Sequence, residues 1–211
     1  MAAAGDVYAN APYYAFTGKI SWLTGTIKAA LFGSGYTPAT DLTEPFFSSI
    51  TGEISGTGYT AGGQALTSLS ATVTEANSWS LTAATTHAYV LGDVVKPSGG
   101  NGFLYQCVVA GTSGGSAPTW PTVVGTTVTD GTVTWECVGQ SICVFTSAAP
   151  SWTSSTLTNV DYLVVYDNTT GVASTSPLIN LQTFATAESD SSGTFTVTPD
   201  PVYGWFVAFP S

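Results

Sequence analysis

The chain has 211 residues, which is enough for one or two domains. Its formal net charge is -10, with no arginine and only Lys19, Lys28 and Lys96 as cations, so a nucleic-acid backbone would be repelled. Only 8% of the residues are charged and 44% are hydrophobic, and Thr, Ser and Gly dominate the remainder. This composition favours strands and tight turns over helices, and we expect an all-β protein.

Targeting signals are not expected. The sequence has no run of about 18 apolar residues, so no segment is expected to span a membrane. The first residues, 1–14, carry no basic side chain of the kind that precedes the apolar part of a secretory leader. We therefore expect synthesis in a host cytoplasm without processing, and no membrane partner.

The N-terminal part predicts an arm followed by one strand. Residues 1–17 are rich in small side chains and tyrosines, which is typical of an arm. Leu23, Ile27, Ala29 and Leu31 then alternate with polar residues. This alternation predicts a strand with one buried face.

A glycine-rich segment at 52–66, GEISGTGYTAGGQAL, is the most informative part of the chain. Five glycines surround Tyr59, and glycine is used where the backbone needs a positive φ or where another chain comes close. The segment has no lysine and lacks the GxxxxGK[ST] order, so we favour a packing role over phosphate binding. Alternation resumes over 65–73 and predicts one strand or a pair of strands.

The amino-acid composition changes over 77–140, where tryptophans and tyrosines are spaced among glycines and prolines. TVTDGTVTW at 127–135 predicts a hairpin, with Asp130-Gly131 as a type I′ turn and Val128 and Val133 on one side. Another turn is expected at 97–102, before a strand at 103–110. We expect a small inserted module of β-hairpins.

Beyond residue 140 the framework resumes with further short strands. Leu163, Val164 and Val165 are consecutive apolar residues and cover both faces, so the strand at 162–166 is expected to be central in its sheet. The remaining strands are expected at 142–145, 178–184, 194–198 and 205–209. The predicted organisation is a discontinuous β-sandwich framework, 1–76 and 141–211, interrupted by the β module 77–140.

The framework resembles a widespread family of tailed-phage virion structural proteins. The matching segments, in the family's order, are TIKAALFGSGYTP at 26–38, SGTGYTAGGQAL at 55–66, the Trp-containing strand at 145–152, YDNTTGVASTSPLI at 166–179 and SSGTFTVTPDPVYGWFVAF at 191–209. The resemblance implies a non-enzymatic assembly protein.

The insert resembles small aromatic modules of the chitin-binding carbohydrate-module type. These share the order Trp, Tyr, Gly-Asp-x-Val, Tyr-x-Cys, Pro-x-Trp. The matching residues are Trp79, Tyr89, Gly92, Asp93, Val95, Tyr105, Cys107, Pro118 and Trp120.

The aromatic residues of the insert have two uses that the sequence leaves open. Trp79, Tyr89 and Trp120 are candidates for stacking on sugar rings, and Trp120 is expected to be the most exposed. The same rings could form the core of so small a module, which is the preferred interpretation for Trp79 and Trp135.

Catalytic and metal chemistry are not expected. His87 is the only histidine and no GxSxG turn is present. Glu188 and Asp190 lie among serines and could offer oxygens to calcium, but a solvated loop is the preferred interpretation. Cys107 and Cys137 could be bonded, although a reducing cytosol favours buried thiols. We expect no enzyme activity, no cofactor and no metal.

These observations together predict a capsid decoration or cement protein on the outer surface of a virion. Its expected partners are the major capsid protein, further copies of itself, and surface glycans through the insert. The candidate assembly-loop residues are Gly56, Gly58, Tyr59, Gly62 and Gly63. The alternatives are a tail or neck component and a carbohydrate-binding adhesion protein.

Overall fold

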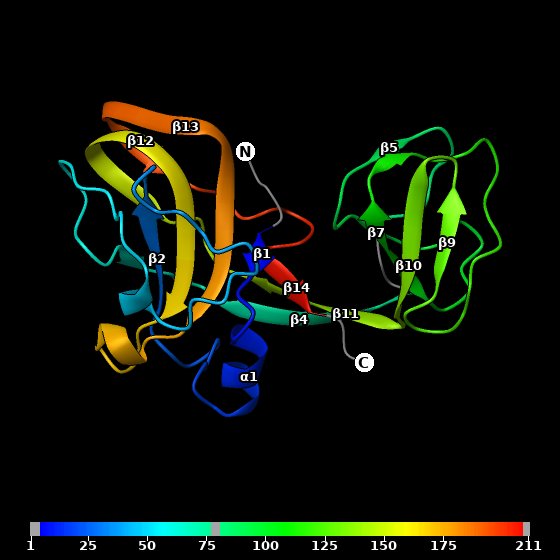
Figure 1. The fold of residues 1–211 in the computed structure, drawn as a ribbon, viewed down its shortest axis with the longest axis horizontal. Helices are drawn as coiled ribbons and strands as arrows, with labels where there is room; N and C mark the ends of the chain where they lie inside the picture. Colours follow the sequence, from blue (N-terminus) through cyan, green and yellow to red (C-terminus); the bar gives the residue numbers. More distant parts are fainter. Residues whose placement is uncertain (1–4, 77–80, 209–211) are drawn as a thin grey trace. The chain divides into compact units, whose positions relative to one another are not determined.

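The computed structural model describes residues 5–76 and 81–208 and is nearly all-β, with 46% strand and 6% helix (Figure 1). Its several antiparallel sheets confirm the expected all-β, sandwich-like fold. The chain forms two compact units. Unit 1 holds the described parts of Met1–Ala71 and Phe145–Phe206, and unit 2 holds those of Thr72–Val144 and Val207–Ser211.

The boundaries of the units fall inside three strands. These are β4 (Ser70–Glu75), β11 (Ser141–Thr146) and β14 (Phe206–Ala208), which form a sheet in the order β14-β11-β4. The described part of the predicted insert, 81–140, lies within unit 2.

Unit 1 is built on a five-stranded sheet in the order β1-β13-β12-β2-β3. Its strands are β1 (Asp6–Val7), β2 (Ile27–Phe32), β3 (Gln64–Ala65), β12 (Ser151–Asp167) and β13 (Leu178–Thr196).

The predicted central strand, 162–166, is part of β12, and β12 is indeed the central strand of this sheet. Its consecutive apolar residues serve two cores, one on each face. Leu163 and Val165 pack with Trp22, Trp152 and Trp205 in what we call the tryptophan core. Val164 and Tyr166 pack with Tyr8 and Tyr36 in what we call the tyrosine core.

Strand β2 is buried on both faces, so the expectation of a half-buried strand at 23–31 was wrong. Ala29 and Leu31 face the tryptophan core, whereas Ala30 and Phe32 face the tyrosine core. Leu23 lies outside the strand and is 61% exposed. The second face is covered because the N-terminal arm packs over it.

This arm holds the one α-helix among the described residues, α1 (Ala11–Phe16), where no helix was predicted. Pro12 lies in its first turn, where a missing N–H costs nothing. Ala11 and Tyr14 are buried against unit 1, and Tyr14 stacks on Phe46 with ring centroids 5.3 Å apart. Two short 3₁₀ helices, η1 (Phe47–Ser49) and η3 (Ala173–Thr175), lie in loops of the same unit.

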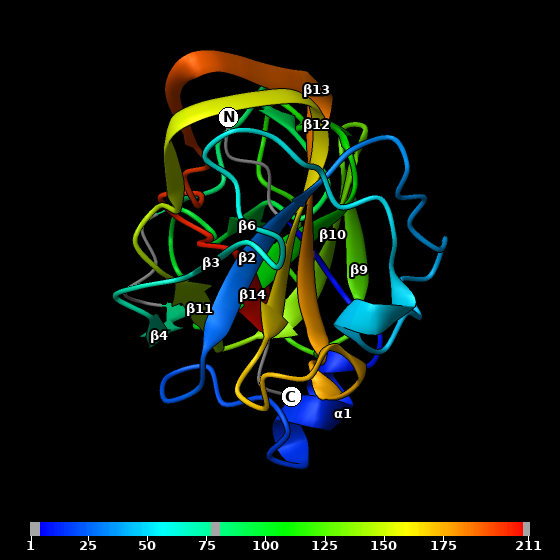
Figure 2. The same ribbon diagram turned by 90° about the vertical axis from the view of Figure 1, so that its left-hand side faces the viewer.

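Strands β12 and β13 form one long antiparallel hairpin that curves strongly (Figure 2). The two strands predicted at 178–184 and 194–198 are a single strand, and the loop expected between them does not exist. Bulges interrupt the pairing, and Ser154, Asn159 and Ser192 take positive φ near them. Such bulges let one strand bend from one layer into another.

The bend closes the tryptophan core. Trp152 and Phe195 from one end of the hairpin share this core with Leu163 and Ile179 from the other end. The sandwich of unit 1 therefore arises in part from one hairpin folding over its own apolar face.

Unit 2 contains a four-stranded sheet in the order β6-β7-β10-β9 and a two-stranded sheet, β5-β8. The strands are β5 (Ala88–Tyr89), β6 (Val94–Val95), β7 (Leu104–Val109), β8 (Gly111–Thr112), β9 (Thr127–Asp130) and β10 (Val133–Gly139). The turn predicted at 97–102 joins β6 to β7.

The predicted hairpin at 127–135 is present, with its turn shifted by one residue. Asp130 pairs with Val133, so the turn consists of Gly131 and Thr132. Gly131 has a φ of +66° and Thr132 has no positive φ, which fits a type II′ turn and not the expected type I′. Val128 and Val133 pack into the same core, as predicted.

Candidate functional site

The glycine-rich segment 52–66 lies directly against strands of unit 1. A Cβ atom on Gly63 would overlap the carbonyl group of Ala29 in β2, and one on Gly56 would overlap the carbonyl of Thr156 in β12. Between them, Thr57 forms a β-bridge with Thr156, whose N–H donates to the Thr57 carbonyl at 3.0 Å. The glycines are thus needed because the loop backbone runs in contact with two strands.

A hydrogen-bond network around Tyr59 fixes the loop. The Tyr59 hydroxyl donates to Oε1 of Glu53 at 2.7 Å and accepts from the N–H of Leu31 at 2.9 Å. The same carboxylate oxygen accepts from the N–H of Gly62, and the Tyr166 hydroxyl donates to the Gly62 carbonyl at 2.8 Å. Burial raises the pKa of both Tyr59 and Tyr166, so both remain neutral donors at ordinary pH.

The five assembly-loop candidates therefore fall into two groups. Tyr59, Gly62 and Gly63 are partly buried and hold the loop to the sheet. Gly56 and Gly58 are exposed, but their backbone also lies against β12, where an added Cβ atom would meet Thr156 and Ser155. The result is a loop whose glycines lie against the sheet and which remains exposed at residues such as Thr60.

The aromatic candidates of unit 2 lie mostly in its core. Trp135 is fully buried, as expected, and Tyr89 is 8% exposed, so Tyr89 offers no open face for a sugar. The Tyr89 hydroxyl accepts from the N–H of Ala84 at 2.8 Å, and its ring meets Trp135 edge-on at 4.7 Å. Trp79 lies outside the described residues.

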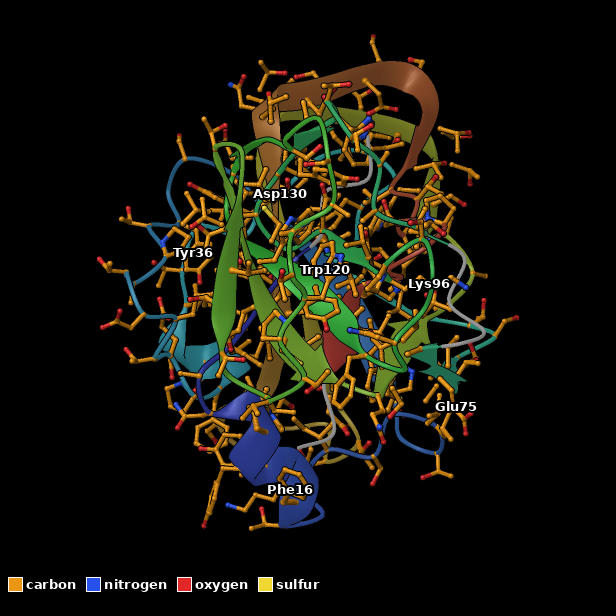
Figure 3. All side chains as sticks on the ribbon, turned by 90° about the vertical axis from the view of Figure 1, so that its right-hand side faces the viewer. Phe16, Tyr36, Glu75, Lys96, Trp120 and Asp130 are labelled. Atoms are coloured by element: carbon orange, nitrogen blue, oxygen red, sulfur yellow. The ribbon has the colours of Figure 1, made fainter. Side chains whose placement is uncertain are left out.

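Trp120 is partly exposed, but it also packs inward (Figure 3). Its ring lies 4.4 Å from Tyr105 and 5.9 Å from Trp135, measured between centroids. Its indole N–H is buried and has no hydrogen-bond partner. Of the two glycan-contact candidates in the described residues, Trp120 is the more exposed.

The Gly-Asp-x-Val motif of the insert has a conformational explanation. Gly92 has a φ of +90°, and the carboxylate of Asp93 accepts from the N–H of Val90 at 2.9 Å. These two residues close a tight turn whose tip exposes Leu91, while Val95 is buried. The motif therefore specifies a turn and needs no ligand.

The side chains of Ser113 and Asp130 bond to main-chain atoms of neighbouring segments, and the main chain of His87 is one of these partners. Ser113 Oγ donates to the Ala84 carbonyl at 2.7 Å and accepts from the main-chain N–H of His87 at 3.0 Å. Asp130 accepts from the N–H of Gly114 at 2.8 Å. The His87 ring packs edge-on against Tyr89 at 4.7 Å. This arrangement fastens loops together and contains no nucleophile paired with a base.

Of the two acidic residues considered for calcium, Asp190 has a structural use. Asp190 lies in β13, where its carboxylate accepts from Ser155 Oγ at 2.6 Å and from the N–H of Leu157 at 3.0 Å. Over residues 5–76 and 81–208, no group of three or more His, Cys, Asp or Glu side chains could hold a metal ion.

The three cysteines are free thiols, and two of them lie in the core of unit 2. Cys107 pairs across the sheet with Trp135, and Cys137 pairs with Tyr105. Burial raises the pKa of both thiols, which lowers their reactivity.

A surface feature of unit 1 was missed by sequence reasoning. An open pocket of about 560 Å³ lies beside β1 and is lined by residues of the loop 38–42. A second feature is Phe16, which is exposed at the end of the helix α1. The only sequence signal was the aromatic content of the arm, because the pocket is assembled from segments that are far apart in the chain.

Comparison with known proteins finds no matching family model, no matching curated protein and no matching solved structure. Within the described part of the chain, none of the helices has the length and apolar character needed to cross a bilayer.

Proposed function

We propose that this protein is a non-enzymatic structural component of a tailed-phage virion, and specifically a capsid decoration or cement protein. Unit 1 docks on the major capsid protein at the outer surface of the particle, and unit 2 is displayed. The main support is the glycine-rich loop, which carries the family resemblance and which is a rigid surface loop locked to β2 and β12.

Binding of unit 1 to the capsid is favoured by surface segments that already have their bound conformation. The loop is exposed at Thr57 and Thr60, while its glycines pack against the sheet and Tyr59 is hydrogen-bonded to β2. A loop fixed in this way loses little conformational entropy when it binds. Among the described residues, the outer edge of β13 beyond Leu181 has no strand partner, so its main chain is available for strand addition.

The polar groups that might perform chemistry are already engaged in the fold. Ser113, Asp130 and Asp190 bond to main-chain atoms, and the hydroxyl of Tyr59 bridges β2 and Glu53. This use of the reactive side chains supports a structural role over a hydrolytic one.

The test is to add the purified protein to shells that lack it and to measure the temperature at which the shells break open. We expect the protein to bind stoichiometrically and to raise this temperature. Thr60→Asp, which places a charge on the exposed part of the loop, should weaken binding. Thr24→Asp, at an exposed position elsewhere on unit 1, should not. If the wild-type protein neither binds nor raises the disruption temperature, the cement role is wrong.

A tail or neck position belongs to the same class of function and is distinguished by counting copies per particle and locating labelled protein by electron microscopy. A decoration protein is distributed over the shell in copies related to its symmetry, whereas a tail or neck protein is found along one axis of the particle.

Glycan contact by unit 2 is a second proposal, supported by the partial exposure of Trp120. Insoluble chitin should retain the full-length protein, and Trp120→Ala should release it. The control is Leu91→Ala at the exposed turn, which should leave retention unchanged. Failure of the wild-type protein to bind chitin or other polysaccharides would remove this proposal without affecting the first.

A further inference from the structure

Phe16 is the most exposed large hydrophobic residue among those described. It lies at the end of α1 with 92% of its surface accessible, and Tyr13, one turn earlier, is 62% exposed (Figure 3). A phenylalanine buries about 150–250 Å² when it is covered, so leaving it in water forgoes a large gain. Single exposed apolar residues are common, but Phe16 and Tyr13 form an exposed aromatic pair, and aromatic residues are enriched at the centres of interfaces.

Three polar contacts fix the base on which Phe16 is presented. The N–H of Ala9, before the helix, donates to the Leu42 carbonyl at 3.0 Å. The Asn10 side chain donates to the Thr43 carbonyl at 3.0 Å. After the helix, Lys19 places its ammonium group 5.1 Å from the centre of the Tyr14 ring and remains exposed. Phe16 and Lys19 thus form an aromatic and cationic knob.

The pocket beside β1 has walls of complementary chemistry. Its apolar lining includes Val7, Leu42, Tyr162 and Leu181, and Asp6 and Asp41 are exposed acids at the same site. The pocket is wide open to solvent and has a volume of about 560 Å³, so an aromatic side chain can lie in it.

The pocket is preformed. Leu42 holds a φ of +47°, which costs a leucine energy and persists only where the surroundings impose it. Its loop is tied by the N–H of Leu42 to the Ala39 carbonyl at 2.9 Å and by the N–H of Ala39 to Glu44 Oε1 at 2.8 Å. Backbone strain held in this way is found at binding sites.

Charge favours a second copy as the occupant. The chain has three cations against 13 acids, so a knob that carries one of those lysines is suited to an acidic receptor. Asp6 and Asp41 provide that receptor on every copy. The knob and the pocket both belong to unit 1.

We propose that Phe16 of one copy inserts into the pocket beside β1 of the next copy, with Lys19 paired to Asp41 and Asp6. The contact joins two different surfaces, so it is heterologous and generates a ring if the rotation closes, or an open chain if it does not. This interface deepens the proposed function by naming how neighbouring copies on a shell are linked. The interface is tested by self-association of the free protein. A negative result would therefore remove this interface but would not contradict the proposed binding to the shell.

The first experiment measures self-association of the full chain by sedimentation velocity over a range of concentrations. We expect oligomers of the wild-type protein. Phe16→Ser should weaken association about tenfold or more, as truncation of a central interface aromatic does. Because Phe16 is almost fully exposed, the variant should fold normally, which thermal unfolding checks. The matched control is Leu23→Ser, an equally apolar exposed position in unit 1.

The charge pair is tested by reversal. Lys19→Glu should weaken association, and adding Asp41→Lys to the same chain should restore part of it. A direct test keeps Phe16 and mixes two preparations, one with Thr17→Cys beside the knob and one with Thr40→Cys at the pocket, both carrying Cys143→Ser, in the presence of a bifunctional maleimide. We expect the heterodimer of these two variants to be cross-linked in preference to either homodimer. A protein that stays monomeric, association unchanged by Phe16→Ser, or equal loss with Leu23→Ser would each overturn the proposal.

Discussion

Gly63 combines two separate requirements for glycine at one residue. Its φ is +62°, and an added Cβ would overlap the backbone of Ala29 and Ala30 in β2. Gly171 also has a positive φ, +69°, but nothing lies within 4 Å of the position of its Cβ. The two residues therefore separate the cost of the backbone conformation from the cost of the close approach.

We expect Gly171→Ala to lower the free energy of unfolding by about 1 kcal/mol, which is the cost of a left-handed conformation for alanine. Gly63→Ala should lower it by about 3 kcal/mol or more, because the loop must also move away from β2. Urea denaturation monitored by tryptophan fluorescence measures both. Equal effects of the two substitutions would contradict the close approach.

Tyr8 and Tyr36 lie in the tyrosine core and are hydrogen-bonded through their hydroxyls at 2.7 Å. Burial raises the pKa of Tyr36 to about 12 and raises that of Tyr8 further. Below about pH 10 both phenols are protonated whether the chain is folded or unfolded, so their contribution to stability is fully present. Above that pH the unfolded chain releases protons first, and the folded state loses this contribution.

The free energy of unfolding should therefore fall by about 1.4 kcal/mol per pH unit for each such tyrosine as the pH rises above about 10. Chemical denaturation at several alkaline pH values measures the slope, and phenolate absorbance follows the ionisation. Tyr36→Phe should give a shallower slope. A stability that does not change in this range would mean that these hydroxyls are accessible to water.

Among the elements, the β12–β13 hairpin depends on side chains that replace lost ladder bonds at its bulges. Asp190 accepts from the N–H of Leu157 and from Ser155 Oγ, whereas Glu188, two residues away on the same strand, makes no comparable contact in the described structure. The hydrogen bonds to a charged acceptor are worth more than ordinary ones.

Asp190→Ala should lower the free energy of unfolding by about 2 kcal/mol, because the N–H of Leu157 loses its charged acceptor and the buried Ser155 hydroxyl is left with the Trp152 carbonyl alone. Glu188→Ala is the matched control and should change it by about 0.5 kcal/mol or less. Thermal and urea unfolding of both variants measure the difference. The same loss in both would show that the carboxylate does not support the bulge.

The same hairpin shows why local patterns predicted some elements and not others. The apolar run Leu163-Val164-Val165 predicts a central strand correctly, because burial on both faces leaves a direct mark on the sequence. The stretch from Ala185 to Gly193 is polar and was expected to be a loop. It is a strand because Asp190 and Ser189 bond to the partner strand, and hydrophobic alternation carries no trace of such bonds.

Candidate sites were predicted less completely than strands. The glycine-rich loop was recognised because glycine density is a local signal. The pocket beside β1 draws on residues near positions 6, 40, 162 and 181, and only the folded sheet brings these together. Tyr89 was considered for a surface role, but its ring fills the core that a small module needs.

For the molecule as a whole, the most testable feature is that each unit has its own tryptophan-centred core. Trp205 is 1% exposed in the tryptophan core of unit 1, and Trp135 is fully buried in unit 2. Each of these side chains contributes to one core only.

Trp135→Ala should destabilise unit 2 by about 3–5 kcal/mol, and Trp205→Ala should do the same to unit 1. Hydrogen exchange read by mass spectrometry is the measurement. We expect faster exchange over 88–139 in the first variant and over 151–196 in the second, with the other unit protected as before. Simultaneous loss of protection in both units would show that the chain unfolds as one cooperative body.

The order of strands in unit 1 has a consequence for biosynthesis. Asp6 pairs with Leu181 and Lys28 with Tyr166, so the sheet joins residues that leave the ribosome far apart in time. Unit 2 needs only neighbours within 88–139 to complete its two sheets. Unit 2 can thus fold during synthesis before β12 and β13 have been made, whereas the N-terminal strands of unit 1 cannot yet pair. The glycine-rich loop packs against β12, so it is fully supported only late in translation.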